Sequence, residues 1–237
     1  IFQARTQEPS GREGRVNWGV WGMNRFPRPA LLCVMFAQRY NPAMSLHPQL
    51  STPRLLLRPW CEADRAPFAA LNADPLVMEY FPARLTREAS DAMVDRIMTH
   101  FSERGFGFWA VEIPGITPFA GFIGLGVPRY ETHFTPSIEV GWRLAAQYWN
   151  RGYATEGARE ALRFGFGQLR LQEIVSFTAV GNTRSRRVME KLGMNHHPDD
   201  DFPHPLLAED HPLRRHVLYR MTADNYMRIP SESRSNT

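Results

Sequence analysis

The stretch from 137 to 193 constrains the fold of this chain more than any other segment. Apolar and polar side chains alternate over 137–144, so we expect a strand with one buried face. Small residues then recur at helical spacing over 154–165. A β-branched and aromatic run at 173–179 predicts a second strand. Residues 182–193 predict a further helix, which begins at an asparagine N-cap and is closed by a glycine.

The turn before the first helix of this stretch has the features of a phosphate-binding site. Backbone amides from Arg151 to Thr155 would point out of a helix N-terminus, whose dipole favours anions. Gly152 would let a pyrophosphate approach the backbone, because glycine has no Cβ. Since glycine is common before helices, the turn alone does not define a function.

The order of these elements resembles that of the GNAT superfamily of acetyl-CoA-dependent N-acetyltransferases. The resemblance covers roughly residues 50–226. Within the superfamily, the sequence is similar to the branch that contains the ribosomal-protein N-terminal acetyltransferases. In that family a Gln/Arg-x-x-Gly-x-Gly/Ala segment wraps the CoA pyrophosphate. Gly152 and Ala154 match this segment, whereas Trp149 stands where Gln or Arg is usual.

The resemblance also implies a second contact with CoA along the later helix. Asn182 and Ser185 match its Asn-x-x-Ser pattern, and 190–194 match its end. Many members carry a tyrosine at the position of Met189, which protonates the departing thiolate, so that acid is unassigned here. The cofactor-binding residues that the resemblance implies are Val140, Trp142, Arg151, Gly152, Tyr153, Ala154, Thr155, Asn182, Ser185 and Met189.

The expected fold is a single α/β domain over residues 44–226, with a mixed, mostly antiparallel central sheet flanked by helices. The acetyl-CoA cleft is expected between the fourth and fifth strands. Helices are expected at 62–73, with Ala66, Ala69, Ala70 and Leu71 inward, and after Thr86, with Met93, Val94, Ile97, Met98 and Phe101 inward. The expected strands are 54–58, 108–113, 119–127, 137–144, 173–179 and 215–221.

The two ends of the chain lack this periodicity. We expect residues 1–43 to form a non-native or disordered extension that is dispensable for the domain, and residues 227–237 to form a flexible tail. The apolar run at 30–36 is too short to span a membrane.

Composition limits the partners. The formal net charge is +4, but no arginine-rich block with interleaved aromatic residues is present, so we expect no nucleic-acid partner and no membrane partner. A mildly positive chain suits an anionic cosubstrate such as acetyl-CoA. Cys33 and Cys61 form no CxxC motif, which favours a reducing cytoplasm. The chain is expected to be a monomer or a homodimer.

Acetyl transfer needs a base, because a primary amine is protonated at neutral pH. Glu139 lies on the polar side of its expected strand and is the candidate base; alternatively, it is a structural partner of Arg143 or Arg54. Ser185 could support the departing thiolate by a hydrogen bond, or it is a serine on the helix surface.

Aromatic residues are candidates for the acceptor channel. Tyr80, Phe81 and Trp109 could line it, although such residues are more often part of the core, which is the interpretation favoured for Trp142. The histidines and aspartates of 196–204 include metal-ligand types, but a solvated acidic loop is favoured and no metal is expected.

Several functions remain open. The favoured one is direct acetyl transfer from acetyl-CoA to a primary amine, and the branch resemblance implies a protein or peptide N-terminus. The alternatives are an inactive CoA-binding sensor module, an acetyltransferase for a small amine or an antibiotic, and, from the pI of about 9.4 alone, a nucleic-acid-binding protein. Neither cysteine suits a nucleophile, so no acetyl-enzyme is expected.

Overall fold

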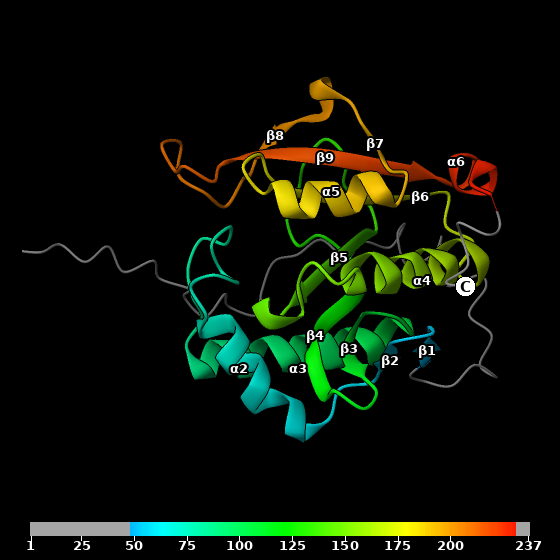
Figure 1. The fold of residues 1–237 in the computed structure, drawn as a ribbon. Coiled ribbons are helices and arrows are strands. Elements are labelled where there is room, and N and C mark those ends of the chain that lie inside the picture. Colours follow the sequence, from blue (N-terminus) through cyan, green and yellow to red (C-terminus); the bar gives the residue numbers. More distant parts are fainter. Residues whose placement is uncertain (1–47, 231–237) are drawn as a thin grey trace, which may run out of the picture. The chain divides into compact units, whose positions relative to one another are not determined.

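A computed structural model describes residues 48–230 of this protein, so the predicted extension at 1–43 lies outside the described residues. Within them, one sheet has the strand order β1-β2-β3-β4-β5-β6-β9-β7, and β8 pairs with β9 (Figure 1). All neighbouring strands are antiparallel except β5 and β6, which are parallel. The predicted α/β fold with a mixed, mostly antiparallel sheet is therefore confirmed. No helix among the described residues is long and apolar enough to cross a membrane.

The elements follow one another as expected, with short additions. The strands are β1 (Leu50–Ser51), β2 (Leu56–Arg58), β3 (Phe108–Ile113), β4 (Thr117–Gly126), β5 (Glu139–Leu144), β6 (Glu173–Ala179), β7 (Asn195–His196), β8 (Phe202–Pro203) and β9 (Arg215–Thr222). The α-helices are α2 (Arg65–Ala73), α3 (Arg87–Arg104), α4 (Tyr153–Gly167), α5 (Thr183–Lys191) and α6 (Ala223–Arg228), and the 3₁₀ helices are η1 (Glu62–Asp64), η2 (Ala146–Tyr148) and η3 (Pro198–Asp200).

The parallel pair β5–β6 is held together only at one end. Glu139 is in register with Val175, whose N–H donates to the carbonyl of Ile138 at 2.9 Å. Beyond this pair the two strands diverge, and β6 continues to pair with β9 along its whole length. In Figure 1, β6, β9 and α5 lie together on one side of β5, and β4 and β3 lie on its other side. The divergence leaves the backbone of β5 without a strand partner on its β6 side.

The helix α4 packs closely on the sheet because its inward face includes small residues at helical spacing, as predicted. A Cβ on Gly157 would lie 2.5 Å from Ile123 Cδ1, and a Cβ on Gly165 would lie 2.6 Å from Ile174 Cδ1. Both values are too short for real carbon contacts, so a larger residue at either position would have to displace an isoleucine side chain. This close contact fixes the N-terminus of α4 relative to β4 and β6.

The prediction for the inward face of the first helix was correct for Leu71 and wrong for the three alanines. The helix is divided into η1 and α2, and its buried residues are Phe68, Leu71 and Asn72. Of the predicted inward alanines, Ala66 and Ala70 are exposed and Ala69 is partly buried. Phe68 decides the orientation because it buries far more apolar surface than any alanine, and its ring packs edge-on against Trp60, 5.0 Å between centroids.

Other boundaries were predicted more accurately. The side chain of Thr86 caps α3, and Gly105 ends it in the left-handed conformation at φ 73°. Val94, Ile97 and Phe101 are buried as expected, whereas Met98 is 42% exposed and Met93 is only partly buried. The short helix α6 was not predicted, and it extends two residues into the expected tail.

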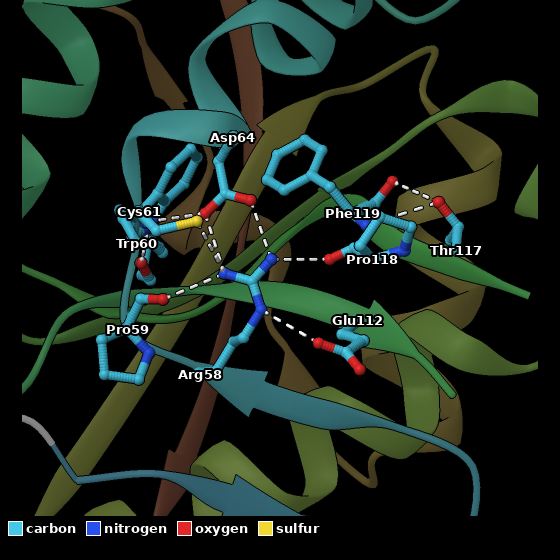
Figure 2. Close-up of polar contacts among 10 residues, drawn as sticks. Arg58, Pro59, Trp60, Cys61, Asp64, Glu112, Thr117, Pro118 and Phe119 are labelled. Carbon is cyan, nitrogen blue, oxygen red and sulfur yellow. Dashed lines mark hydrogen bonds and ion pairs between the residues drawn. The ribbon is translucent and has the colours of Figure 1, made fainter. Parts of the chain in front are cut away.

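A network of charges around Arg58 fastens η1 to the sheet (Figure 2). Two nitrogens of Arg58 donate to the two carboxylate oxygens of Asp64, each at 2.8 Å, and Nε donates to Glu112 at 3.1 Å. Further contacts go to the carbonyls of Pro59, at 3.1 Å, and Pro118, at 2.6 Å, and to Cys61 Sγ, at 3.9 Å. Every nitrogen of this guanidinium therefore has an acceptor, as expected for a structural arginine.

Candidate active site

A cavity of about 550 Å³ opens where β5 and β6 diverge. Its walls come from the α2–α3 loop, β5, the turn before α4, the end of β6, α5 and the segment that leads into β9. The sequence-predicted site residues that line it are Tyr80, Phe81, Glu139, Val140, Trp142, Gly152, Tyr153, Ala154, Thr155, Asn182, Ser185 and Met189. The fold therefore brings together side chains that are more than 100 positions apart in the sequence.

Two of the predicted site residues, Trp109 and Arg151, do not line the cavity. Trp109 is fully buried in the core: its Nε1–H donates to the carbonyl of Pro48 at 2.6 Å, and its ring packs edge-on against Phe101 and Phe164. The prediction that Trp109 lines the acceptor channel is corrected, because this face of β3 points to the helices. Trp142, for which a core position was favoured, is only partly buried and does line the cavity.

The turn before α4 is held rigidly. Gly152 has φ +83° and is the N-cap of α4, and Asn150 also has a positive φ, +59°. Arg54 donates from Nη1 to the carbonyl of Arg151 at 3.0 Å and forms an ion pair with buried Glu156, with Nη2 and Oε2 2.5 Å apart. The first N–H groups of a helix have no acceptor within the helix. The turn therefore presents free amides in a fixed geometry. The side chain of Arg151, which was also predicted to bind the cofactor, is exposed and does not line the cavity.

The N-terminus of α5 forms the opposite wall. Asn182 is its N-cap as predicted: Oδ1 accepts from the amide of Ser185 at 3.2 Å, and Nδ2 donates to Thr178 Oγ1 at 2.9 Å. The Ser185 side chain is partly buried and faces the cavity, and its hydroxyl has no hydrogen-bond partner within residues 48–230. Met189, in the place of the family tyrosine, is buried and offers no proton.

Glu139 lies at the start of β5, on the cavity wall. Neither of its predicted alternative partners reaches it, since Arg54 pairs with Glu156 and Arg143 with Asn72. Within the described part of the chain, Glu139 forms no ion pair. Burial raises the pKa of Glu139 to about 7, because desolvation disfavours the charged carboxylate. This carboxylate can therefore accept a proton near neutral pH.

Three residues with perturbed protonation lie on the cavity wall or beside it and had no predicted role. His204 and His216 line the cavity with ring centroids 4.9 Å apart, and burial lowers the pKa of His204 to about 4 and also lowers that of His216. The ring of Tyr130 packs 4.7 Å from that of His204; burial, and then the charge of Glu139, raise the tyrosine pKa. The two histidines on the cavity wall are thus polar and uncharged at neutral pH.

The acidic loop after α5 is used for packing. His196 pairs with Asp201 at 2.8 Å, and Asp200 pairs with Arg220 at 2.8 Å. Among residues 48–230 there is no group of three or more His, Cys, Asp or Glu side chains that could hold a metal ion.

Comparisons with known proteins agree with this geometry. The family described as "Acetyltransferase (GNAT) domain" matches residues 54–195. The chain is 33% identical over 201 residues to the "FsC-acetyl coenzyme A-N(2)-transacetylase" of Aspergillus fumigatus, an alignment that covers 79% of this chain and 83% of that protein.

Solved structures show the same fold. A GNAT-family acetyltransferase from Bacillus anthracis superposes with a TM-score of 0.61 at 26% identity, covering 75% of this chain and 99% of that one. At 15% identity, the ribosomal-protein-S5-alanine acetyltransferase from Vibrio fischeri shares the fold alone, with a TM-score of 0.60 over 76% of this chain and 98% of that one. The divergent strands, the glycine turn before α4 and the matched domain together place this chain in the GNAT acetyltransferase family.

Proposed function

We propose that this protein is an acetyl-CoA-dependent N-acetyltransferase that transfers the acetyl group directly to a primary amine. The observation that carries the proposal is the position of Glu139, an unpaired carboxylate on the cavity wall at the point where β5 and β6 diverge. Its raised pKa, about 7, suits a general base that works near neutral pH.

Acetyl-CoA would occupy the gap between β5 and β6. Its pyrophosphate would contact the free amides at Gly152 to Thr155, where a Cβ on Gly152 would lie only 3.3 Å from Arg54 Nη2. The acetyl-bearing arm would follow the unpaired edge of β5, whose backbone can supply an N–H donor to the oxyanion of the tetrahedral intermediate. The side chains along α5 that face the cavity, Ser185 and Met189, would form the other wall.

The transfer uses two side chains in sequence. Glu139 would remove a proton from the acceptor ammonium, after which the nitrogen attacks the thioester carbonyl. The C–S bond then breaks, the nitrogen loses its second proton, which passes through solvent to the leaving thiolate, and the Ser185 hydroxyl would donate a hydrogen bond to that thiolate as it leaves. Cys61, the cysteine among the described residues, is exposed, contacts Arg58 and does not line the cavity. A covalent acetyl-enzyme is therefore not part of the proposal.

Two acceptor classes are proposed for a screen. The resemblance to ribosomal-protein acetyltransferases favours the N-terminal amine of a peptide or protein. The name of the Aspergillus fumigatus relative, an N(2)-transacetylase, indicates acetyl transfer to a nitrogen, and an amine of a small molecule is the second class for the screen. A thiol-release assay with peptides, polyamines, amino acids and aminoglycosides separates these classes. The peptide N-terminus is the favoured acceptor, and strong activity on an amino sugar with none on peptides would favour the small molecule instead.

The cofactor site is tested by Gly152→Asp. This variant places a side chain and a negative charge where the pyrophosphate is proposed to bind, so we expect calorimetry to show a large loss of CoA affinity. Gly167→Asp is the matched control, because a Cβ on Gly167, at the end of α4, meets no atom within 4 Å. Unchanged CoA affinity in a folded Gly152→Asp protein would place the cofactor elsewhere. CoA binding without turnover on any amine would favour the sensor alternative.

A further inference from the structure

A second charged side chain on β5 faces the cavity and has no place in the proposed chemistry. Arg143 is only 9% exposed and lines the cavity wall. It is four residues after Glu139 on the same strand, so both side chains leave β5 on the same face. The sequence pattern placed Arg143 on the polar face and did not predict that it would be buried.

The contacts of Arg143 leave most of its donors unused. One nitrogen, Nη1, donates to Asn72 Oδ1 at 2.5 Å. Its Nε is buried and has no hydrogen-bond partner within residues 48–230, and no carboxylate in that part of the chain forms an ion pair with Arg143. A guanidinium carries five N–H donors in a planar fork that matches a carboxylate. A buried cation without an anion is costly, so the site as it stands is incomplete.

The guanidinium is nevertheless fixed in place. Its central carbon lies 3.9 Å from the ring centroid of Phe81 and 5.4 Å from that of Phe122. Its partner Asn72 is fully buried and donates from Nδ2 to Ser90 Oγ at 2.9 Å, so its Oδ1 must face the arginine. Elements from three parts of the chain, α2, α3 and β4, thus hold Arg143 in a single orientation. An arginine held in this way loses little further entropy when it binds a ligand.

We propose that Arg143 binds a carboxylate of the acetyl acceptor, so that the substrates are primary amines that also carry a carboxylate. This inference rests on the proposed N-acetyltransferase function and names the chemical class of the acceptor. The amine would lie at Glu139 and the carboxylate at Arg143.

The spacing along β5 indicates the length of such an acceptor. Four residues of strand separate the two Cα atoms by about 13 Å, and Glu139 and Arg143 form no ion pair with each other. The amine and the carboxylate of the acceptor should therefore be several bonds apart, as in an ω-amino acid or a short peptide with a free C-terminus.

The alternative anion is a phosphate of the cosubstrate. The neighbours of Arg143 argue against it, because Asn72 and Phe81 belong to α2 and the α2–α3 loop, whereas the free amides proposed for the pyrophosphate lie at the start of α4. The two sources predict different results when the arginine is removed.

The experiment compares matched acids and amides as acceptors: 6-aminohexanoate with 6-aminohexanamide, and trialanine with trialanine amide. For the wild type we expect kcat/KM to favour the acids by about 10–100-fold, mostly through KM, the range for a charge-assisted hydrogen bond. Arg143→Met should abolish this preference and leave CoA affinity unchanged, and Arg143→Lys should keep part of it. Arg87→Met is the matched control, because Arg87 pairs with Asp91 on the surface of α3 and does not line the cavity.

A binding measurement makes the inference independent of turnover. Calorimetry with 6-acetamidohexanoate and its amide, in the presence of CoA, should show the same preference for the acid and its loss in Arg143→Met. If no amine is acetylated but this preference holds, the proposed function fails and the anion site stands. Equal binding and equal turnover of acids and amides in the wild type would overturn the anion site and leave the acetyltransferase in place. A loss of CoA affinity in Arg143→Met would assign the arginine to the cosubstrate and also overturn the inference.

Discussion

Two arginines, each at one end of a strand and both largely buried, have opposite surroundings. Arg58 at the end of β2 contacts Asp64, Glu112 and two backbone carbonyls, so that each of its nitrogens has an acceptor (Figure 2). Arg143 near the end of β5 has one amide oxygen as its hydrogen-bond partner within residues 48–230. The hydrogen bonds to Asp64 raise the pKa of Arg58, whereas burial lowers the pKa of Arg143 to about 9.

The difference separates a structural site from a binding site. Around Arg58 the chain supplies both signs of charge, and the network is complete without a ligand. On the cavity face of β5, Glu139 and Arg143 are each left without a charged partner in the described chain, although their burial makes an unpaired charge unfavourable. Such sites are where a ligand with complementary groups gains most, and the proposed acceptor, with its ammonium and its carboxylate, would complete both.

The largest expected effect is that of Glu139→Gln on turnover. The variant keeps the shape of the side chain but removes the proton acceptor, so kcat should fall by roughly 10²–10⁴-fold, the usual range for a positioned base. CoA affinity should hardly change, and part of the loss should be recovered at high pH, where more of the amine is already neutral. Steady-state kinetics by thiol release measures each of these.

The control for this variant is the same change in the structural network. Glu112→Gln removes a carboxylate from Arg58, 3.1 Å away, so it should lower stability and leave kcat nearly unchanged. Near-normal turnover of Glu139→Gln at neutral pH would show that Glu139 is structural, and the distinction between the two regions would then fail.

The second prediction compares the two arginines by stability. Arg58→Met leaves Asp64, which is buried, without its cation, so the free energy of unfolding should fall by about 3–5 kcal/mol. Arg143→Met removes an unpaired buried cation but leaves Asn72 Oδ1 without a donor, and these effects should cancel to within about 1 kcal/mol. Urea denaturation measures both. Equal losses in the two variants would mean that Arg143 is as structural as Arg58.

The third prediction concerns pH. The folded-state pKa of Glu139, about 7, lies above its ordinary value of 4.5, so the folded protein keeps a proton that the unfolded chain has released. The free energy of unfolding should therefore fall as pH rises from about 4.5 to 7, and Glu139→Gln should remove this fall, a difference of about 3 kcal/mol above pH 7. Over the same range kcat/KM of the wild type should rise, because the ionised carboxylate is the base.

Denaturation of the wild type and of Glu139→Gln at pH 5 and pH 8 checks the sign. Greater stabilisation by the substitution at pH 5 than at pH 8 would contradict a raised pKa. Glu112→Gln again serves as the comparison, since the carboxylate it removes contacts Arg58 and is not on the cavity wall.

The periodic parts of this fold could be predicted from the sequence because they carry a repeated signal. The strand limits Phe108–Ile113 and Glu173–Ala179 and the caps Thr86 and Asn182 were predicted correctly, since local patterning or side-chain capping decides them. The inward position of three alanines in α2 was not, because one large residue, Phe68, outweighs them, and two of its ring partners, Phe119 and Phe122, come from the distant strand β4.

The site was predictable mainly where a motif or the alternation of a strand marks it. Gly152 and Asn182 carry local signals, and both line the cavity. Arg143 and the contact between Arg54 and Glu156 depend on partners about 70 and 100 positions away, so no spacing rule reveals them. Trp109 illustrates the reverse error, because a lone aromatic residue looks the same in a core and in a channel until the neighbouring helices are placed.

The smallest expected effect is that of Ser185→Ala, and it tests whether a free hydroxyl on the cavity wall contributes to the reaction. The hydroxyl has no partner within residues 48–230, so its loss should leave stability unchanged. Its proposed hydrogen bond to the leaving thiolate is between weak partners, and water can replace it, so kcat should fall by only about 2–10-fold. Ser102→Ala is the control, because that hydroxyl donates to the carbonyl of Met98 within α3 and does not line the cavity. A wild-type kcat in Ser185→Ala would mean that water alone stabilises the leaving thiolate. A loss beyond 100-fold would mean that water cannot replace the hydroxyl, and it would assign to Ser185 the role of the acid, which Met189 cannot fill.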